Sequence, residues 1–267
     1  MNGLAAKRLF LLDMDGTIYL DDRLFDGTLD FLAYVKAIGG RALYLTNNSS
    51  KSVQRYVEKL KRMGIDAEAE DFYTSVNATV RFLKEKSYRL IYAFGTEAFR
   101  AQLSEAGLPV TERREAGIDC LCMGFDTELA FQKLEDACIL LGQGVDYIAT
   151  NPDWVCPTWY GYVPDCGSVA EMLFRATGRR PRFIGKPQPE MVRFAMERAG
   201  FSPAETILVG DRLYTDIAAG VNAGVDTALV LSGEATLADV EQSEIKPACL
   251  FRDIREMLTV MRGEKTV

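Results

Sequence analysis

The 267-residue chain contains no histidine. This absence excludes Ser-His-Asp hydrolysis, phosphohistidine chemistry and metal sites built on imidazole ligands. Acid–base catalysis in this chain must therefore come from carboxylates, Lys, Tyr or Cys. The six cysteines form no CxxC pair, and in a cytosolic chain of this length we interpret them as reduced and mostly buried apolar residues.

The chain also lacks a long apolar run and an excess of basic residues. No segment approaches the roughly 20 apolar residues of a membrane span, and the N-terminal run Leu9–Leu12 is too short for the core of a signal peptide. With 31 basic against 38 acidic residues, the net charge of −7 argues against nucleic-acid polymers and anionic membranes as main partners. We expect a cytoplasmic protein.

What is present is the composition of a globular protein. The chain is 48% apolar and 26% charged, which excludes disorder as its main state, and its length suits one large or two modest domains. Strand-like and helix-like stretches alternate, as in parallel α/β proteins. The alternation restarts near Ser87, and residues 178–181 have the composition of a linker.

The expected elements are short apolar runs and stretches of helical periodicity. The predicted strands are Leu9–Leu12, Ala42–Leu45, Leu90–Ala93, Cys120–Cys122, Tyr147–Ala149, Arg182–Ile184, Thr206–Val209 and Thr227–Leu231. The predicted helices are Leu29–Ile38, Ser52–Met63, Ala78–Lys86, Glu97–Ala106, Leu129–Leu141, Val169–Thr177, Glu190–Ala199, Thr215–Ala223 and Ile254–Met261.

Two carboxylates stand directly after the first predicted strand. Asp13 and Asp15 are two residues apart, and Gly16 permits the tight turn that would bring both to one ligand. Taken alone, such a pair is more typical of a solvated turn or a helix cap. The sequence argues against a calcium loop of the EF-hand type, because its twelfth position would be Leu24 rather than a bidentate Glu.

Three further polar segments also follow predicted strands. Residues 46–50, Thr-Asn-Asn-Ser-Ser, taken alone favour a turn with a helix cap over a phosphate site, although both can hold together because donors at a helix start also bind phosphate. Lys186 lies in a Gly-Lys-Pro segment that is not a Walker loop, because Pro187 replaces the required Ser or Thr. Asp211 and Asp216 begin a helix, where the dipole favours acidic residues in any case. Since the carboxyl ends of parallel strands share one edge of a sheet, these segments can meet in one pocket.

In this order, the four segments resemble the motifs of the haloacid dehalogenase-like superfamily of phosphotransferases. The resemblance rests on Asp13-x-Asp15-Gly-Thr, Thr46-Asn47, Lys186 and Gly-Asp211-x4-Asp216, and it covers nearly the whole chain. Connecting segments such as Gly124-Phe125-Asp126 and residues 149–153 resemble the branch of NagD and the p-nitrophenyl phosphatases. The resemblance implies a Rossmann-like parallel sheet core of residues 1–85 and 182–267, with an inserted α/β cap domain of type C2 over residues 86–181.

The resemblance also implies catalytic roles. Asp13 would attack phosphorus and form an aspartyl-phosphate, and Asp15 would protonate the leaving oxygen and later take a proton from water. Lys186 and Thr46 would stabilise the phosphoryl oxygens, and Asn47 would help to hold phosphate or substrate.

The charges of these residues point to a cofactor. Four carboxylates against Lys186 would repel a phosphate dianion unless a divalent cation is present, and Mg²⁺ is the expected ion. By resemblance, the carboxylates of Asp13 and Asp211 and the backbone carbonyl of Asp15 would be ligands. Asp216 would be an anchor behind the ligands or an outer ligand.

The favoured function is a Mg²⁺-dependent phosphatase that acts on a small phosphorylated metabolite such as a sugar phosphate or a nucleotide. Asp15 favours a phosphatase or phosphomutase over a dehalogenase, and the spacing from Asp15 to Thr46 leaves no room for a mutase-type cap. The alternative is a non-catalytic phospho-ligand-binding or regulatory protein on the same fold. The substrate and the oligomeric state, a homodimer included, stay open.

The segment from Asn151 to Tyr160 contains both tryptophans and two prolines. One interpretation is packing or a subunit interface. The other is a loop that closes over the phosphate pocket, as in relatives with this cap type, with Asn151, Asp153, Trp154 and Cys156 as candidate substrate contacts. Some relatives carry a histidine near Cys156, and because this chain has none, their contact there is not carried over.

Overall fold

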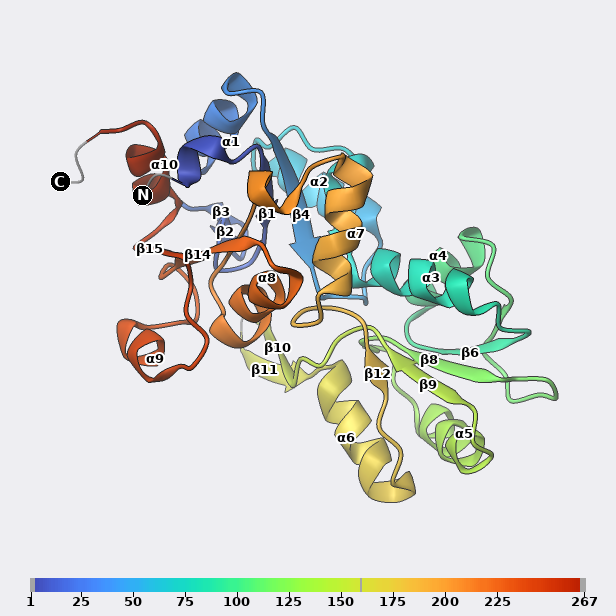
Figure 1. The fold of residues 1–267 in the computed structure, drawn as a ribbon. Helices are drawn as coiled ribbons and strands as arrows, with labels where there is room; N and C mark the ends of the chain where they lie inside the picture. Colours follow the sequence, from blue (N-terminus) through green and yellow to red (C-terminus); the bar gives the residue numbers. More distant parts are fainter. Residues whose placement is uncertain (1–2, 159, 265–267) are drawn as a thin grey trace. The chain divides into compact units, whose positions relative to one another are not determined.

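The computed structural model describes residues 3–158 and 160–264. The chain divides into two compact units: the first comprises residues up to 46, 53–73 and 186 onwards, and the second comprises residues 47–52 and 74–185 (Figure 1). Each unit contains a parallel sheet whose strands alternate with helices along the chain. The α/β class and the Rossmann-like sheet that the sequence predicts are therefore confirmed.

The first unit is built on a six-stranded sheet with the order β15-β14-β13-β1-β4-β5. Its strands are β1 (Leu9–Leu12), β4 (Arg41–Thr46), β5 (Phe72–Thr74), β13 (Thr206–Gly210), β14 (Asp226–Val230) and β15 (Cys249–Phe251). All four residues of β1 are buried, as expected for a central strand that is covered on both faces. In parallel register, Leu12 lies opposite Val209 of β13 and Tyr44 of β4. The carboxyl end of β1 therefore lies between those of β13 and β4.

Helices and a short hairpin complete the first unit. The helices are α1 (Thr28–Ala37), α2 (Val53–Arg62), α7 (Glu190–Ala199), α8 (Ala218–Ala223), α9 (Leu237–Gln242) and α10 (Ile254–Met261), and the hairpin strands are β2 (Tyr19–Leu20) and β3 (Arg23–Leu24). Helices α1 and α10 lie side by side (Figure 1). Phe31 of α1 packs edge-on against Phe10 of β1, and both belong to one buried apolar core.

The second unit has a five-stranded sheet with the order β12-β9-β8-β6-β7. Its strands are β6 (Ile91–Phe94), β7 (Val110–Thr111), β8 (Cys120–Met123), β9 (Asp146–Ala149) and β12 (Arg182–Phe183). Its helices are α3 (Ser75–Lys86), α4 (Glu97–Glu105), α5 (Phe131–Gly142) and α6 (Cys166–Thr177). Two antiparallel strands, β10 (Val155–Thr158) and β11 (Gly161–Pro164), form a separate hairpin.

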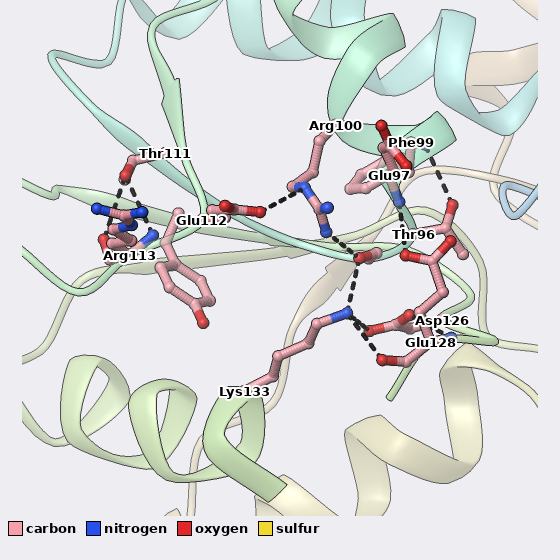
Figure 2. A network of polar contacts seen from close by, with 12 residues as sticks. Thr96, Glu97, Phe99, Arg100, Thr111, Glu112, Arg113, Asp126, Glu128 and Lys133 are labelled. Carbon is pink, nitrogen blue, oxygen red and sulfur yellow. Dashed lines mark hydrogen bonds and ion pairs between the residues drawn. The ribbon is translucent and has the colours of Figure 1, made fainter. Parts of the chain in front are cut away.

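A network of polar contacts joins the ends of β6 and β8 in the second unit. Figure 2 shows Lys133 of α5 pointing to Asp126. Its Nζ atom lies 2.7 Å from Asp126 Oδ2 and 3.0 Å from the Gly95 carbonyl oxygen. Arg100 of α4 donates to the same Gly95 carbonyl. Asp126 also accepts a hydrogen bond from the backbone of Glu128. Since these groups satisfy one another, the network fixes the two strand ends rather than leaving open polar groups for a ligand.

The observed structure differs from the sequence prediction in several places. The strand at Arg182–Phe183 was expected in the core, but it pairs with β9 of the second unit's sheet, and α3 belongs to that unit as well. The second unit thus extends beyond the expected range 86–181. The segment from Asn151 to Tyr160, expected as a loop, contains strand β10, which pairs with β11, and Pro157 and Gly161 concealed the strand pattern. Trp159 lies outside the described residues.

Among the described residues, no helix is both long and apolar enough to cross a membrane.

Candidate active site

Three carboxylates gather at the carboxyl edge of the first unit's sheet. Asp13 follows β1, Asp211 follows β13, and Asp216 lies in the turn of π-helix that spans Leu213–Ile217. One carboxylate oxygen of each lies within 4.8 Å of the others. Glycines make room around Asp211, because a Cβ at Gly16 or Gly233 would lie 2.4 or 2.0 Å from its Oδ2 atom.

Lys186 connects two members of this carboxylate group. Its Nζ atom lies 2.5 Å from Asp13 Oδ1 and 2.6 Å from Asp216 Oδ1, and the side chain is buried. Burial by itself would lower the pKa of Lys186, but the charges of Asp13 and Asp216 outweigh it and raise this pKa above its ordinary value. Lys186 therefore stays charged at neutral pH.

The carboxylates destabilise one another despite this lysine. Burial, followed by the charge of Asp216, raises the pKa of Asp13 well above its ordinary value, although Lys186 opposes the shift. Burial and Asp216 likewise raise the pKa of Asp211 to about 6. The ionised cluster therefore favours an additional cation.

Asp211 has an oxygen that is available to such a cation. Its Oδ2 atom accepts the backbone N–H of Glu234 at 2.8 Å. Its Oδ1 atom is buried and has no hydrogen-bond partner among the described residues. A buried carboxylate oxygen without a partner is costly, so this atom fits the position of a metal ligand.

Arg212 is a site residue that the sequence analysis missed. Its Nε atom lies 2.9 Å from Glu234 Oε2, and its backbone N–H donates to Asp216 Oδ2 at 3.1 Å. Burial would lower the pKa of Arg212, but the charges of Asp13 and Glu234 raise it. The site thus holds a second cation beside Lys186, together with the Glu234 carboxylate that pairs with it, and the charge balance expected from the sequence counted neither. Its position directly after Asp211 was the available signal.

Asp15 is not one of the three carboxylates that lie within 4.8 Å of one another. Its side chain is 53% exposed, with Oδ2 accepting the Tyr19 hydroxyl at 3.2 Å and Oδ1 lying 3.7 Å from Lys59 Nζ. Neither Tyr19 nor Lys59 was identified from the sequence.

The two expected phosphate-binding residues after β4 differ in their surroundings. Thr46 is the buried last residue of the strand, in the first unit. Asn47 belongs to the second unit, where its side-chain N–H donates to Asp153 Oδ2 at 2.7 Å and its carbonyl accepts the Ser75 hydroxyl at 2.7 Å. The side-chain amide of Asn47 therefore has a structural partner within the second unit.

The expected substrate contacts of the cap fall into two groups. Asn151 is fully buried and donates to Asp153 and to Asp165, the residue that caps α6. Cys156 is half-buried against the apolar core of the second unit. Trp154 is 58% exposed. Asn151 and Asp153 thus stabilise the loop internally, whereas Trp154 presents its side chain to solvent.

Comparison with known families identifies the chain. Residues 10–109 match a family model described as haloacid dehalogenase-like hydrolase, and residues 183–257 match a second one described as HAD-hydrolase-like. An acid sugar phosphatase of Staphylococcus aureus (strain MRSA252) is 35% identical over 252 residues, which cover 94% of this chain and 96% of that protein. The chain belongs to the haloacid dehalogenase-like hydrolases.

Solved structures support the same conclusion for this hydrolase. The 4-nitrophenylphosphatase of Thermotoga maritima has a TM-score of 0.92 and 40% identity, covering 97% of this chain and 98% of that one. The glycerol phosphate phosphatase of Mycobacterium tuberculosis, solved in complex with magnesium, has a TM-score of 0.89 and 30% identity, covering 96% and 78%. It was also solved with calcium. These relatives confirm a phosphatase of the NagD and p-nitrophenyl phosphatase branch.

The two matched segments contain the expected core residues of the hydrolase. Asp13, Asp15, Thr46 and Asn47 lie in the first segment, and Lys186, Asp211 and Asp216 lie in the second. Residues 110–182, with Asn151, Asp153, Trp154 and Cys156, lie between the two.

Proposed function

We propose that this phosphatase hydrolyses a small phosphomonoester, a sugar phosphate or a nucleotide, with Mg²⁺ as cofactor and a phosphoryl group carried transiently on Asp13. The observation that supports this proposal best is the buried group of Asp13, Asp211 and Asp216 around Lys186. Because the chain has no histidine, a carboxylate is a chemically sensible nucleophile here.

The residues present suit Mg²⁺. The carboxylates of Asp13 and Asp211 would hold it, Asp211 through the buried Oδ1 atom that has no other partner among the described residues. By family resemblance, the carbonyl of Asp15 would be a third ligand. Both oxygens of Asp216 are already engaged, by Lys186 and by the backbone of Arg212, so we assign Asp216 the role of anchoring Lys186. When bound, the ion supplies stabilisation of the charge on the phosphoryl oxygens.

The chain's own residues would carry the chemistry. An oxygen of Asp13 forms a bond to phosphorus while the bond to the leaving oxygen breaks, and Asp15 gives that oxygen a proton. Water then attacks the aspartyl-phosphate, and Asp15 takes a proton from it, which releases phosphate and restores both carboxyl groups. Lys186 and Thr46 would stabilise the equatorial oxygens in both steps.

The names of two relatives support a small phosphomonoester as the substrate. One acts on sugar phosphates and another on glycerol phosphate, according to their names. A panel of sugar phosphates, glycerol phosphate, nucleotides and p-nitrophenyl phosphate, assayed for phosphate release, tests the proposal. Phosphate should be released from p-nitrophenyl phosphate and, with higher kcat/KM, from one class of metabolite. Binding of a phosphomonoester without any release would instead support a non-catalytic phospho-ligand-binding protein.

Trp154→Ala is expected to change substrate selectivity. By family resemblance, the loop that carries this exposed indole selects the leaving group. We therefore expect kcat/KM to change by factors that differ about threefold or more between metabolites, and less for p-nitrophenyl phosphate. Phe131→Ala, which removes an 80% exposed aromatic side chain of the same unit, is the control. This variant should keep the wild-type kcat/KM both for the metabolites and for p-nitrophenyl phosphate. A uniform loss that follows a lower Tm would show that Trp154 is structural.

Mg²⁺ is expected to stabilise the folded protein more at neutral than at acidic pH. Folding raises the pKa values of Asp13 and Asp211 above their values in the unfolded chain. At a pH between the unfolded-state and the folded-state pKa of each group, the folded protein therefore binds more protons than the unfolded chain. Without metal, stability therefore falls as the pH rises from about 4 through about 6. A cation that binds the ionised carboxylates reverses this loss, and at a hundred times its Kd it adds about 2.7 kcal/mol.

For a chain of this size, that increment corresponds to roughly 5–10 °C in Tm. Calorimetry with and without Mg²⁺ should give the full shift at about pH 7.5 and a clearly smaller one at about pH 5, because protonated carboxyl groups bind the ion poorly. Asp211→Asn should remove most of the shift. Equal shifts at both pH values would contradict the assignment of these carboxylates as ligands.

A further inference from the structure

Asp15 and Tyr19 are joined by a tight turn after β1. The backbone N–H of Gly16 donates to the Tyr19 carbonyl, and Ile18 donates to the Met14 carbonyl. This turn places the Tyr19 hydroxyl 3.2 Å from Asp15 Oδ2. The tyrosine is fully buried, and burial together with the charge of Asp15 raises its pKa above the ordinary value. Tyr19 therefore remains a neutral phenol that donates to Asp15.

Lys59 reaches the same carboxyl group from α2. Its Nζ atom lies 3.7 Å from Asp15 Oδ1 and 3.9 Å from the centroid of the Tyr19 ring. The neighbouring α2 residues Val57 and Leu60 are buried in the core of the first unit, so the helix holds Lys59 at this position. The two oxygens of Asp15 thus face two different partners that come from segments forty residues apart in the sequence.

We infer that Tyr19 and Lys59 are positioning residues that orient the Asp15 carboxyl group for proton transfer to the leaving oxygen. The inference rests on the proposed role of Asp15 as the acid. Asp15 is half exposed, and the torsion that turns an exposed carboxyl group without fixed partners is broad and roughly two-fold. Proton transfer requires the carboxyl group within hydrogen-bond reach of the leaving oxygen. A carboxyl group with a hydrogen bond on one oxygen and an ammonium group beside the other has an advantage over a freely rotating one.

The test compares two leaving groups by kcat/KM, which reports only the steps up to departure of the leaving group. Glycerol phosphate has an alkoxide leaving group that requires a proton, whereas the nitrophenolate of p-nitrophenyl phosphate does not. Tyr19→Phe and Lys59→Met should lower kcat/KM for glycerol phosphate about tenfold, part of the 10²–10⁴-fold typical of a general acid, and that for p-nitrophenyl phosphate less than about threefold. Lys61→Met, which removes a lysine of the same helix that pairs with Glu68, is the matched control and should change neither value.

A second measurement asks whether the residues act through Asp15. In an Asp15→Asn background, Lys59→Met and Tyr19→Phe should cause no further loss with glycerol phosphate, because the group that they orient no longer transfers a proton. Equal losses for both substrates, or the full tenfold loss in the Asp15→Asn background, would overturn the inference. If Asp15→Asn itself fails to separate the two substrates, the proposed acid is wrong. If Asp15→Asn separates them but the Tyr19 and Lys59 variants do not, only the positioning role is wrong.

Discussion

Asp13→Asn is expected to leave less than about 1% of wild-type kcat, which corresponds to a barrier raised by more than roughly 2.7 kcal/mol. An amide is a poor nucleophile and a weaker ligand for a hard cation, so the variant loses both proposed functions of this side chain at once. The fold should survive, because the backbone N–H of Asp13 keeps its hydrogen bond to Val209 and the substitution removes one of three crowded carboxylates.

Assays with p-nitrophenyl phosphate and a thermal melt of the same sample check this expectation. Asp21→Asn is a suitable control. Asp21 is an exposed residue with a φ of 52°, in the left-handed region that Asn tolerates, so this variant should keep wild-type activity and Tm. An Asp13→Asn variant that folds and retains more than about 1% of kcat would show that another group attacks phosphorus.

Removal of divalent metal is expected to lower phosphatase activity about as much as Asp13→Asn does. After treatment with EDTA and removal of the chelate, phosphatase activity should fall below about 1%, because the ionised group of Asp13, Asp211 and Asp216 then repels the phosphate dianion. Adding Mg²⁺ should restore activity. Excess Ca²⁺ should inhibit, since its longer bonds and higher coordination number disturb the in-line geometry.

Phosphate release over a Mg²⁺ titration of the stripped protein measures this effect. A parallel Mg²⁺ titration of the Asp216→Asn variant tests whether Asp216 is a metal ligand or only anchors Lys186. If Asp216 only anchors Lys186, this variant should need a similar Mg²⁺ concentration for half-maximal activity but reach a lower maximum. Full activity in the chelated, metal-free sample would contradict the argument from charge.

The carboxylate positions were predictable because they depend on local sequence. The apolar run of β1 ends at Asp13 and that of β13 ends before Asp211, and parallel strands place such ends at one edge. The C-terminal helix Ile254–Met261 was also predicted with its observed bounds, since its apolar periodicity and the preceding Asp253 cap are local signals.

Features that depend on pairing between distant segments were not predictable. The sequence of the two-residue strand β12 is compatible with either sheet. In the structure it pairs with β9, which places it in the sheet of the second unit. The hydrogen bond from Asn47 to Asp153 joins residues 106 positions apart, and the expected contact of Asn47 with phosphate stays a prediction. In the sequence, nothing distinguishes Lys59 from other lysines of a helix. Only the folded structure shows its Nζ atom over the Tyr19 ring. In each case, periodicity and composition carry no information about the partner.

The stereochemical course at phosphorus tests the central claim most directly. Hydrolysis of an isotopically chiral phosphorothioate ester in isotopically labelled water, analysed by phosphorus NMR, shows whether the configuration is kept. Transfer to Asp13 followed by attack of water comprises two in-line displacements, each of which inverts phosphorus. We expect overall retention of configuration with the wild-type enzyme. Inversion would mean that water attacks the substrate directly and that no phosphoryl group is carried on Asp13.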